Sequence, residues 1–249
     1  MNQVLLRGKN LSRQWGGLLA VNQVNVEIFF GKIHAVIGTN GAGKSTLINL
    51  LAGEVPLSSG SVELLEQDVS LWSEPRRARL GLGKSFQKNT IFPDLTVFEN
   101  CRLAAQARHQ RPWKFWETIN SCTYSRTQAQ KVLLKTGLHV LNGKKAGLLS
   151  HGQKRQLEVA MCLATNPKVL LLDEPLAGMG AEETNRMLNF LNELRAEHGI
   201  LLVEHDMDAV FALADRISVL VYGRVIATGT VDDIRANREV REAYLVEEA

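Results

Sequence analysis

Short apolar runs alternate with polar residues over residues 4–38, a pattern typical of β-strands with one buried face. The clearest runs are Val4-Leu5-Leu6 and Val24-Asn25-Val26-Glu27-Ile28. Gly16-Gly17 and Gly31-Lys32 interrupt the pattern, and glycines at such breaks favour tight turns. The front of the chain is therefore predicted to consist of strands joined by turns.

After Pro93 the spacing changes from that of strands to that of helices. Up to about Ser150, packing positions recur at intervals of three and four residues. The positions that carry this spacing are Leu95, Phe98, Glu99, Leu103 and Ala107, followed by Ala129, Val132, Leu133 and Thr136. Residues of about 93–150 are therefore expected to form a helical subdomain.

Two fully apolar runs in the second half have the length and composition of strands buried on both faces. They are Val169-Leu170-Leu171-Leu172 and Ile200-Leu201-Leu202-Val203, and the residues between them, 182–197, have a helical pattern. This strand-helix-strand unit predicts an α/β fold with a parallel sheet. The last apolar runs predict a hairpin, with strands at 217–221 and 224–227 and Tyr222-Gly223 as its turn.

Charge and cysteine content exclude several classes of protein. The formal net charge of the 249 residues is +3, and the charged residues are mixed in sign along the chain, so we expect no nucleic-acid partner. Cys101, Cys122 and Cys162 have neither disulfide-framework nor metal-ligand spacing. We expect them to be packing residues in a reduced, intracellular compartment.

The longest apolar runs have the length of strands, well short of the roughly 18–20 residues that cross a bilayer. The start, Met1-Asn2-Gln3-Val4, lacks the basic, apolar and small-residue order of a secretory signal. We therefore expect a chain that is soluble by itself and is not exported. Any role at a membrane would then require partner subunits.

The segment Gly38-Thr39-Asn40-Gly41-Ala42-Gly43-Lys44-Ser45, followed by Thr46, fits the phosphate-binding pattern GxxxxGK(S/T). Its glycines allow several backbone N–H groups to point at one anion, and the N-terminus of the next helix adds partial positive charge. Lys44 can reach the β and γ phosphates, and the Ser45 hydroxyl can bind magnesium. A plain glycine turn between strand and helix is the alternative. Kinases, GTPases, motors and transporters share such a loop, so it predicts a triphosphate site without choosing among them.

Asp173 and Glu174 follow directly after the buried run that ends at Leu172. Asp173 can reach the coordination shell of a magnesium ion, and Glu174 can polarise a water for attack on the γ phosphate. The alternative is an acidic strand end that caps a helix. Neighbouring carboxylates repel each other, and a bound Mg²⁺ would relieve that repulsion.

The segment Leu149-Ser150-His151-Gly152-Gln153 departs from the sequence LSGGQ at one position only. With it, the chain resembles the nucleotide-binding subunit of ATP-binding-cassette (ABC) transporters over nearly its full length. Six motifs stand in the order of that family: Trp15, the phosphate loop at 38–45, Ser85-Phe86-Gln87, the signature at 149–153, Asp173-Glu174 and His205. Taken singly, Trp15 could be a core residue, Gln87 a solvated loop amide and His205 a capping or buried histidine.

The resemblance implies one nucleotide-binding domain over residues 1–249. It would be an α/β P-loop NTPase core with an antiparallel β subdomain (1–92 and 151–249) and an inserted α-helical subdomain (about 93–150). ATP and Mg²⁺ would be its cofactors. The residues implied to bind nucleotide are Trp15, Gly38, Asn40, Gly41, Ala42, Gly43, Lys44, Ser45, Thr46, Ser150, Gly152 and Gln153. Those implied to hold magnesium are Ser45, Gln87 and Asp173, and the implied catalytic residues are Glu174, His205 and Gln87.

In the family, Ser150 and the backbone of Gly152 would bind the γ phosphate held on the phosphate loop of another subunit. The chain has one set of motifs, so the resemblance implies a dimer with a second ABC ATPase subunit, identical or related. It also implies integral membrane permease subunits and, indirectly, a solute-binding protein. The expected location is peripheral, on the cytoplasmic face of the inner membrane.

Two positions depart from the family pattern: His151 replaces a glycine of the signature, and residues 177–180 (Ala-Gly-Met-Gly) lack an aspartate. We expect phosphate binding to survive and Gly180 to add flexibility. The signature and the flanking segments at 15–21, 203–207 and 240–245 resemble subunits of bacterial importers for branched-chain amino acids, or for related amides such as urea.

Two rival functions are those of a non-transport ABC protein acting on ribosomes or DNA, and of a nucleotide-binding module without turnover. The segment Trp113-Lys114-Phe115-Trp116 is either a subunit-docking patch or a buried corner.

Overall fold

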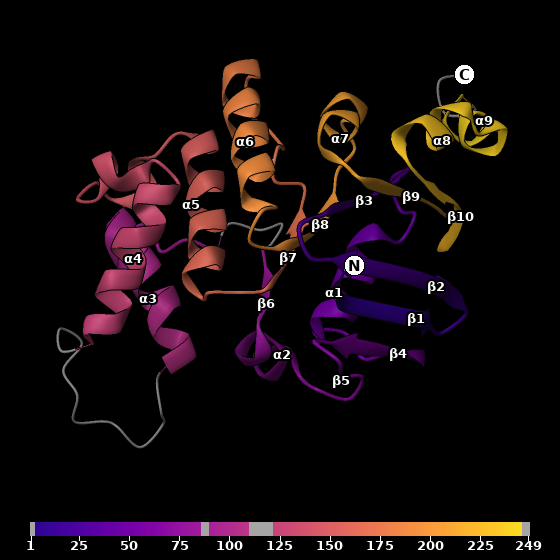
Figure 1. The fold of residues 1–249 in the computed structure, drawn as a ribbon, viewed down its shortest axis with the longest axis horizontal. Coiled ribbons are helices and arrows are strands. Elements are labelled where there is room, and N and C mark those ends of the chain that lie inside the picture. Colours follow the sequence, from indigo (N-terminus) through magenta and orange to yellow (C-terminus); the bar gives the residue numbers. More distant parts are fainter. Residues whose placement is uncertain (1–2, 86–89, 110–121, 246–249) are drawn as a thin grey trace.

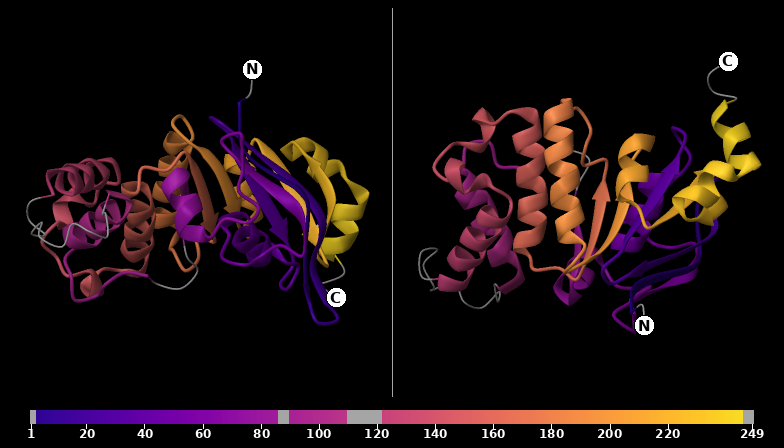
Figure 2. Two further views of the ribbon diagram at one scale, coloured as in Figure 1. Left: turned by 90° about the horizontal axis from the view of Figure 1, so that it is seen from below. Right: turned by 45° about the horizontal axis from the view of Figure 1, so that its top comes forward.

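Two β-sheets lie at the centre of the part of the chain that the computed structural model describes, residues 3–85, 90–109 and 122–245 (Figure 1). One sheet has four strands in the order β2-β1-β4-β5, and the other has six in the order β10-β9-β3-β8-β7-β6. Helices α3, α4 and α5 lie at one end of the molecule, and α8 and α9 lie at the other (Figures 1 and 2). The predicted α/β class is confirmed.

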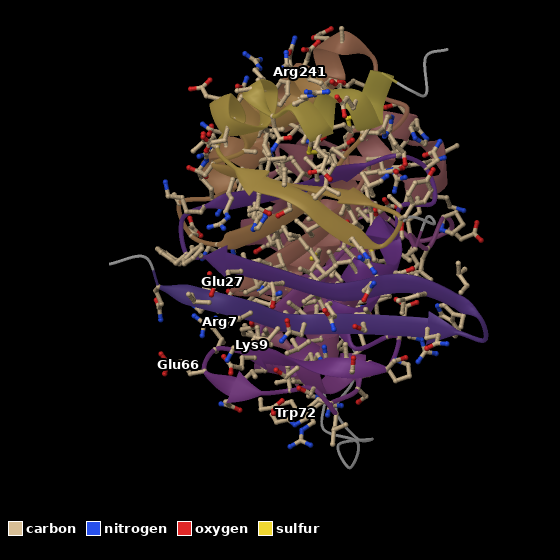
Figure 3. The ribbon with its side chains drawn as sticks, turned by 90° about the vertical axis from the view of Figure 1, so that its right-hand side faces the viewer. Arg7, Lys9, Glu27, Glu66, Trp72 and Arg241 are labelled. Carbon is tan, nitrogen blue, oxygen red and sulfur yellow. The ribbon has the colours of Figure 1, made fainter. Side chains whose placement is uncertain are left out.

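The four-stranded sheet is antiparallel throughout. Its strands are β1 (Val4–Trp15), β2 (Leu18–Phe29), β4 (Ser59–Leu64) and β5 (Gln67–Asp68). The first two form a hairpin, and the predicted turn at Gly16-Gly17 joins them, with a φ of 56° at Gly16. Figure 3 shows Arg7 and Glu27 side by side on β1 and β2, where Arg7 Nε lies 2.6 Å from Glu27 Oε1.

The six-stranded sheet is parallel except for the β9–β10 hairpin at its edge. Its strands are β3 (Ile33–Gly38), β6 (Leu82–Lys84), β7 (Val169–Asp173), β8 (Gly199–Val203), β9 (Arg216–Val221) and β10 (Arg224–Gly229). Every residue of β3, β7 and β8 is buried. The two apolar runs of the second half and the terminal hairpin are therefore confirmed as strands.

Nine helices surround the sheets in the described residues: α1 (Lys44–Ala52), α2 (Glu74–Leu80), α3 (Val97–His109), α4 (Thr123–Lys135), α5 (His151–Ala164), α6 (Ala181–Leu194), α7 (Met207–Leu213), α8 (Val231–Ala236) and α9 (Arg238–Leu245). Two 3₁₀ turns, Leu138–Leu141 and Ala146–Leu148, precede α5. No described helix is both long and apolar enough to span a bilayer.

Alternate residues of the central strands contribute to two different hydrophobic cores. Leu170 and Leu172 of β7 pack with helices α3 to α6, whereas Val169 and Leu171 pack with α1 and the antiparallel sheet. This alternation explains why the strands are apolar at every position. Cys101 and Cys162 are buried in the first core, as expected of packing residues.

The helical spacing predicted for residues 93–150 corresponds to α3 and α4. Leu95 precedes α3, and Thr136 caps the end of α4. The helix predicted at 182–197 ends earlier, at Leu194, because a turn then leads directly into β8. The segment Trp113–Trp116 lies outside the described residues. The division of the chain into subdomains stays a prediction.

Candidate functional site

The phosphate loop connects the end of β3 at Gly38 to the start of α1 at Lys44. Gly43 precedes the helix with a φ of 105°, and a Cβ atom there would overlap the carbonyl oxygen of Ala20. Only glycine fits this position, because both the backbone conformation and the space exclude a side chain. The N-terminus of α1 therefore opens directly onto the loop, where its free N–H groups can bind an anion.

Lys44 lies inside the loop rather than in solvent. Its side chain is buried, and its Nζ donates hydrogen bonds to the carbonyl oxygens of Gly38 at 2.6 Å and Thr39 at 2.9 Å. These bonds hold the ammonium group beside the backbone that would surround a phosphate. A bound phosphate would find this positive charge already in place.

A cavity of about 510 Å³ opens over the loop. From the loop and α1, it is lined by Asn40, Gly41, Ala42, Gly43, Lys44, Ser45 and Thr46. From elsewhere in the chain, it is lined by Trp15, Leu18, Leu19, Ala20, Glu174, Tyr222 and Gly223. We call this space the phosphate-loop cavity. It brings Trp15 and Glu174, which the sequence analysis names as candidate site residues, together with the loop.

Trp15 is the last residue of β1 and is 49% exposed, so the interpretation of Trp15 as a core residue is wrong. The sequence did not single out Tyr222 as a site residue. This tyrosine stands in the β9–β10 turn with a φ of 45°, and its neighbour Gly223 donates a hydrogen bond from its N–H to the Ala42 carbonyl at 2.9 Å. The hairpin turn is therefore attached to the phosphate loop.

Asp173 ends β7 and is almost fully buried. One of its carboxylate oxygens, Oδ1, has no hydrogen-bond partner among the described residues. Burial and the nearby charge of Glu174 raise the pKa of Asp173, while a hydrogen bond from Ser45 opposes that rise. A buried carboxylate with a free oxygen beside a serine hydroxyl fits the oxygen ligands that Mg²⁺ prefers.

Glu174 follows Asp173 with a φ of 49°, a left-handed conformation that is rare for glutamate. Its N–H donates to the carbonyl of Val203 at 2.9 Å, which fixes this turn against β8. The side chain is 25% exposed and faces the phosphate-loop cavity. The alternative role as a helix cap is wrong, since α6 begins at Ala181, seven residues later, with Gly180 as its N-cap.

His205 lies beside Glu174, with its Nδ1 3.9 Å from Glu174 Oε1 and 3.8 Å from Glu204 Oε2. Its side chain is 62% exposed, and Asp206 rather than His205 caps α7. The interpretations of His205 as a buried or capping residue are therefore wrong. Gln87 lies outside the described residues, although its neighbour Ser85 accepts a hydrogen bond from the Asp173 N–H at 3.2 Å.

The signature segment begins α5. Ser150 is the N-cap, and its side chain and that of Gln153 form a reciprocal capping box. Ser150 Oγ also donates to Glu183 Oε1 at 3.2 Å, and the Glu183 carboxylate occupies the space where Gly152 lacks a side chain. Gly152, Gln153 and Glu183 line a second cavity, of about 330 Å³, which shares no lining residue with the phosphate-loop cavity. The signature segment and the phosphate loop therefore line separate cavities of one chain.

His151 contacts the loop that follows Glu174. Its Nε2 lies 3.1 Å from the carbonyl oxygen of Ala177, and a Cβ on Gly178 would lie 2.8 Å from the same nitrogen. Gly178 has a φ of 74°, whereas Gly180 has a φ of −74° that any residue can adopt. Gly178 is therefore the position in this loop that requires glycine. The sequence predicts added flexibility at Gly180, where the backbone conformation does not require glycine.

Comparison with known proteins gives consistent results over almost the whole chain. The family model described as "ABC transporter" matches residues 21–177, and one described as "Branched-chain amino acid ATP-binding cassette transporter" matches residues 224–245. The chain is 38% identical to the "High-affinity branched-chain amino acid transport ATP-binding protein LivG" of Escherichia coli (strain K12), covering 99% of this chain and 100% of that protein. It is 35% identical to the protein of the same description named BraF from Pseudomonas aeruginosa, with the same coverage.

Solved structures agree. A nucleotide-free ATP-binding cassette from an ABC transporter has a TM-score of 0.87 and 29% identity, covering 97% of this chain and 99% of that one. A structure described as the ADP conformation of MJ1267, an ATP-binding cassette of an ABC transporter, has a TM-score of 0.85 and 28% identity, covering 98% of this chain and 99% of that one.

Proposed function

Because the chain belongs to the ABC transporter family of ATP-binding subunits, we propose that it hydrolyses ATP to energise an importer of branched-chain amino acids. The observation that carries the ATPase part is the position of Glu174, which faces the same cavity as the phosphate loop and lies beside His205. The solute is supported by the relatives LivG and BraF, which are both named as branched-chain amino acid transport ATP-binding proteins, and by the family model that matches residues 224–245.

Each group around the phosphate-loop cavity has a distinct chemical task. Lys44 and the N–H groups at the start of α1 bind the β and γ phosphates, and Ser45 with Asp173 holds Mg²⁺. When bound, the magnesium ion neutralises charge on the phosphates. Glu174 accepts a proton from the attacking water, and His205, whose backbone N–H is bonded to Glu204, lies beside it to contact the transferred phosphate. Gln87 is also proposed as a magnesium ligand and a catalytic residue.

The separation of the two cavities supports a dimer as the working unit. ABC transporter ATPase subunits dimerise and act with membrane permease subunits. In our proposal, Ser150 and the N-terminus of α5 complete the ATP site of a second subunit, identical or related. The subunit would bind permeases at the cytoplasmic face of the membrane, and the solute would reach them through a solute-binding protein.

Reconstitution tests the proposed solute. The chain is purified with the membrane subunits that accompany it and inserted into proteoliposomes with the matching solute-binding protein. Leucine, isoleucine and valine are expected to stimulate ATP hydrolysis and to accumulate in the vesicles, whereas urea is expected to do neither. Stimulation by urea alone would replace the proposed solute, and recovery of ribosomes without any permease would contradict the transport role.

A further inference from the structure

Trp15 occupies an exposed end of the β1–β2 hairpin. It is followed directly by Gly16 and Gly17, and a Cβ atom on either glycine would meet no other atom within 4 Å. Trp15 is about half exposed, and it lines the phosphate-loop cavity. A ring at such a position needs support to keep one orientation, because an immobile partner binds more tightly than one that must be ordered.

Arg13 provides that support. It lies two residues before Trp15 on β1. The guanidinium carbon lies 3.8 Å from the centroid of the Trp15 ring. Trp15 lines the phosphate-loop cavity, whereas Arg13 does not, so the guanidinium covers a ring face outside the cavity. A group bound in the cavity would therefore meet the opposite face of the ring.

The guanidinium is itself anchored to the loop that follows α1. Arg13 Nη1 donates a hydrogen bond to the carbonyl oxygen of Pro56 at 3.0 Å. Two further bonds attach the hairpin to the same loop, from the Gln14 N–H to Ser58 Oγ at 3.1 Å and from the Ser58 N–H to the Ser12 carbonyl at 2.9 Å. The N–H groups of arginine lie in the guanidinium plane, so it can donate sideways while its face stacks on a ring. The phosphate loop precedes α1, and the loop that contains Pro56 and Ser58 follows it. Helix α1 therefore connects the support of Trp15 to the phosphate loop.

We propose that Arg13 is a positioning residue for the base of the bound nucleotide, which it serves by holding the Trp15 ring from behind. This inference rests on the proposed binding of ATP and extends it to a residue that does not touch the nucleotide. A cation over an aromatic face is attracted by the negative charge of the ring face, so the pair keeps the ring in one orientation. The Arg13–Trp15 pair therefore strengthens the binding of the base and not that of the phosphates.

The test compares ATP, which has a base, with inorganic tripolyphosphate, which has none. Affinities for ATP and for inorganic tripolyphosphate, both with magnesium, are measured by calorimetry for the wild-type chain and for Arg13→Gln. We expect the ATP affinity to fall about three- to tenfold and the tripolyphosphate affinity to stay within about twofold. Equal losses for both ligands, or no loss for ATP, would overturn the inference.

The chain contains its own matched control. Arg76 stacks on Trp72 with its guanidinium carbon 3.6 Å from the ring centroid. Trp72 does not line the phosphate-loop cavity and lies at the far edge of the antiparallel sheet (Figure 3). Arg76→Gln removes an equivalent stack and is expected to leave both affinities unchanged. A fall in ATP affinity in this control as large as that in Arg13→Gln would overturn the inference.

A double-mutant cycle separates positioning from a general structural role. In a Trp15→Ala background, Arg13→Gln is expected to cause no further loss of ATP affinity, because the ring that it holds is gone. A full additional loss would contradict the role of Arg13 as a support for Trp15. The proposed function is tested separately, since a wild-type chain that binds tripolyphosphate but not ATP would contradict that function itself.

Discussion

The buried carboxylate of Glu204 connects two segments of the reaction site. One of its oxygens accepts a hydrogen bond from the Leu176 N–H at 2.9 Å, and the other accepts one from the His205 N–H at 3.3 Å. Leu176 belongs to the loop that starts with Glu174. Glu204 therefore holds the backbone near Glu174, the proposed base, and the backbone at His205.

Burial raises the pKa of Glu204, against the opposing effect of its backbone hydrogen bonds. A carboxyl group whose pKa is raised by folding stabilises the protein most at a pH below its unfolded pKa, about 4.3, and loses that contribution as the pH rises through the folded value. Glu204→Gln removes this titration. The melting temperature of the wild-type chain minus that of the variant is therefore expected to decrease from pH 4 to pH 8. A constant difference across this range in thermal melts would contradict the account.

At the residue scale, sequence reasoning identified the groups with distinctive chemistry and missed the groups that hold them. Trp15, Lys44 and Glu174 carry rare combinations of residue type and spacing, and the fold brings all three to one cavity. Arg13 and Glu204 are ordinary charged residues in the sequence. Their roles arise from contacts with Pro56 and Leu176, which are distant in the chain and could not be inferred from local pattern.

Helix α5 begins with an anion already at its N-terminus. The carboxylate of Glu183, from α6, accepts a hydrogen bond from Ser150 Oγ and lies against Gly152. Helix N-termini attract negative charge, so Glu183 stabilises this end of α5 within one subunit. A phosphate of a second subunit would have to share or displace the same group, because two anions repel each other at short range.

Glu183→Ala is expected to lower the ATP concentration at half-maximal hydrolysis by about two- to fivefold, the range that corresponds to a helix-terminus charge. The measurement is a steady-state titration with ATP. Glu182→Ala is the matched control, because Glu182 neighbours Glu183 on α6 but has a side chain that is 86% exposed. An unchanged or higher half-maximal concentration in Glu183→Ala would show that the carboxylate does not compete with phosphate.

Elements with strong local patterns were the ones that sequence reasoning placed correctly. The apolar runs of β7 and β8 and the β9–β10 hairpin were placed within one or two residues. Strands β4, β5 and β6 were not predicted, because they are short or only partly buried. The end of α6 was placed too late, since the turn before β8 depends on the sheet and not on helical spacing.

For the whole molecule, the order of the strands in the sheets could not be predicted from the sequence. Strand β3 lies between β8 and β9, which follow it by more than 150 residues, and such parallel pairing leaves no local pattern. This order places the ends of β3 and β7 at the same edge of the sheet, with β8 between them. The phosphate loop and the Asp173-Glu174 pair therefore meet, although the helices α3 to α5 separate them in the chain (Figure 1).

In the proposed function, this arrangement hydrolyses ATP with Glu174 as the base. The most direct test is steady-state ATP hydrolysis by Glu174→Gln within the complex of the chain and its membrane partners, with ATP binding measured in parallel. Glu242→Gln on α9 is the control, since Glu242 is exposed and pairs only with Arg238 among the described residues. We expect Glu174→Gln to lower kcat by about 10²–10⁴-fold with ATP affinity retained; undiminished hydrolysis would contradict the account.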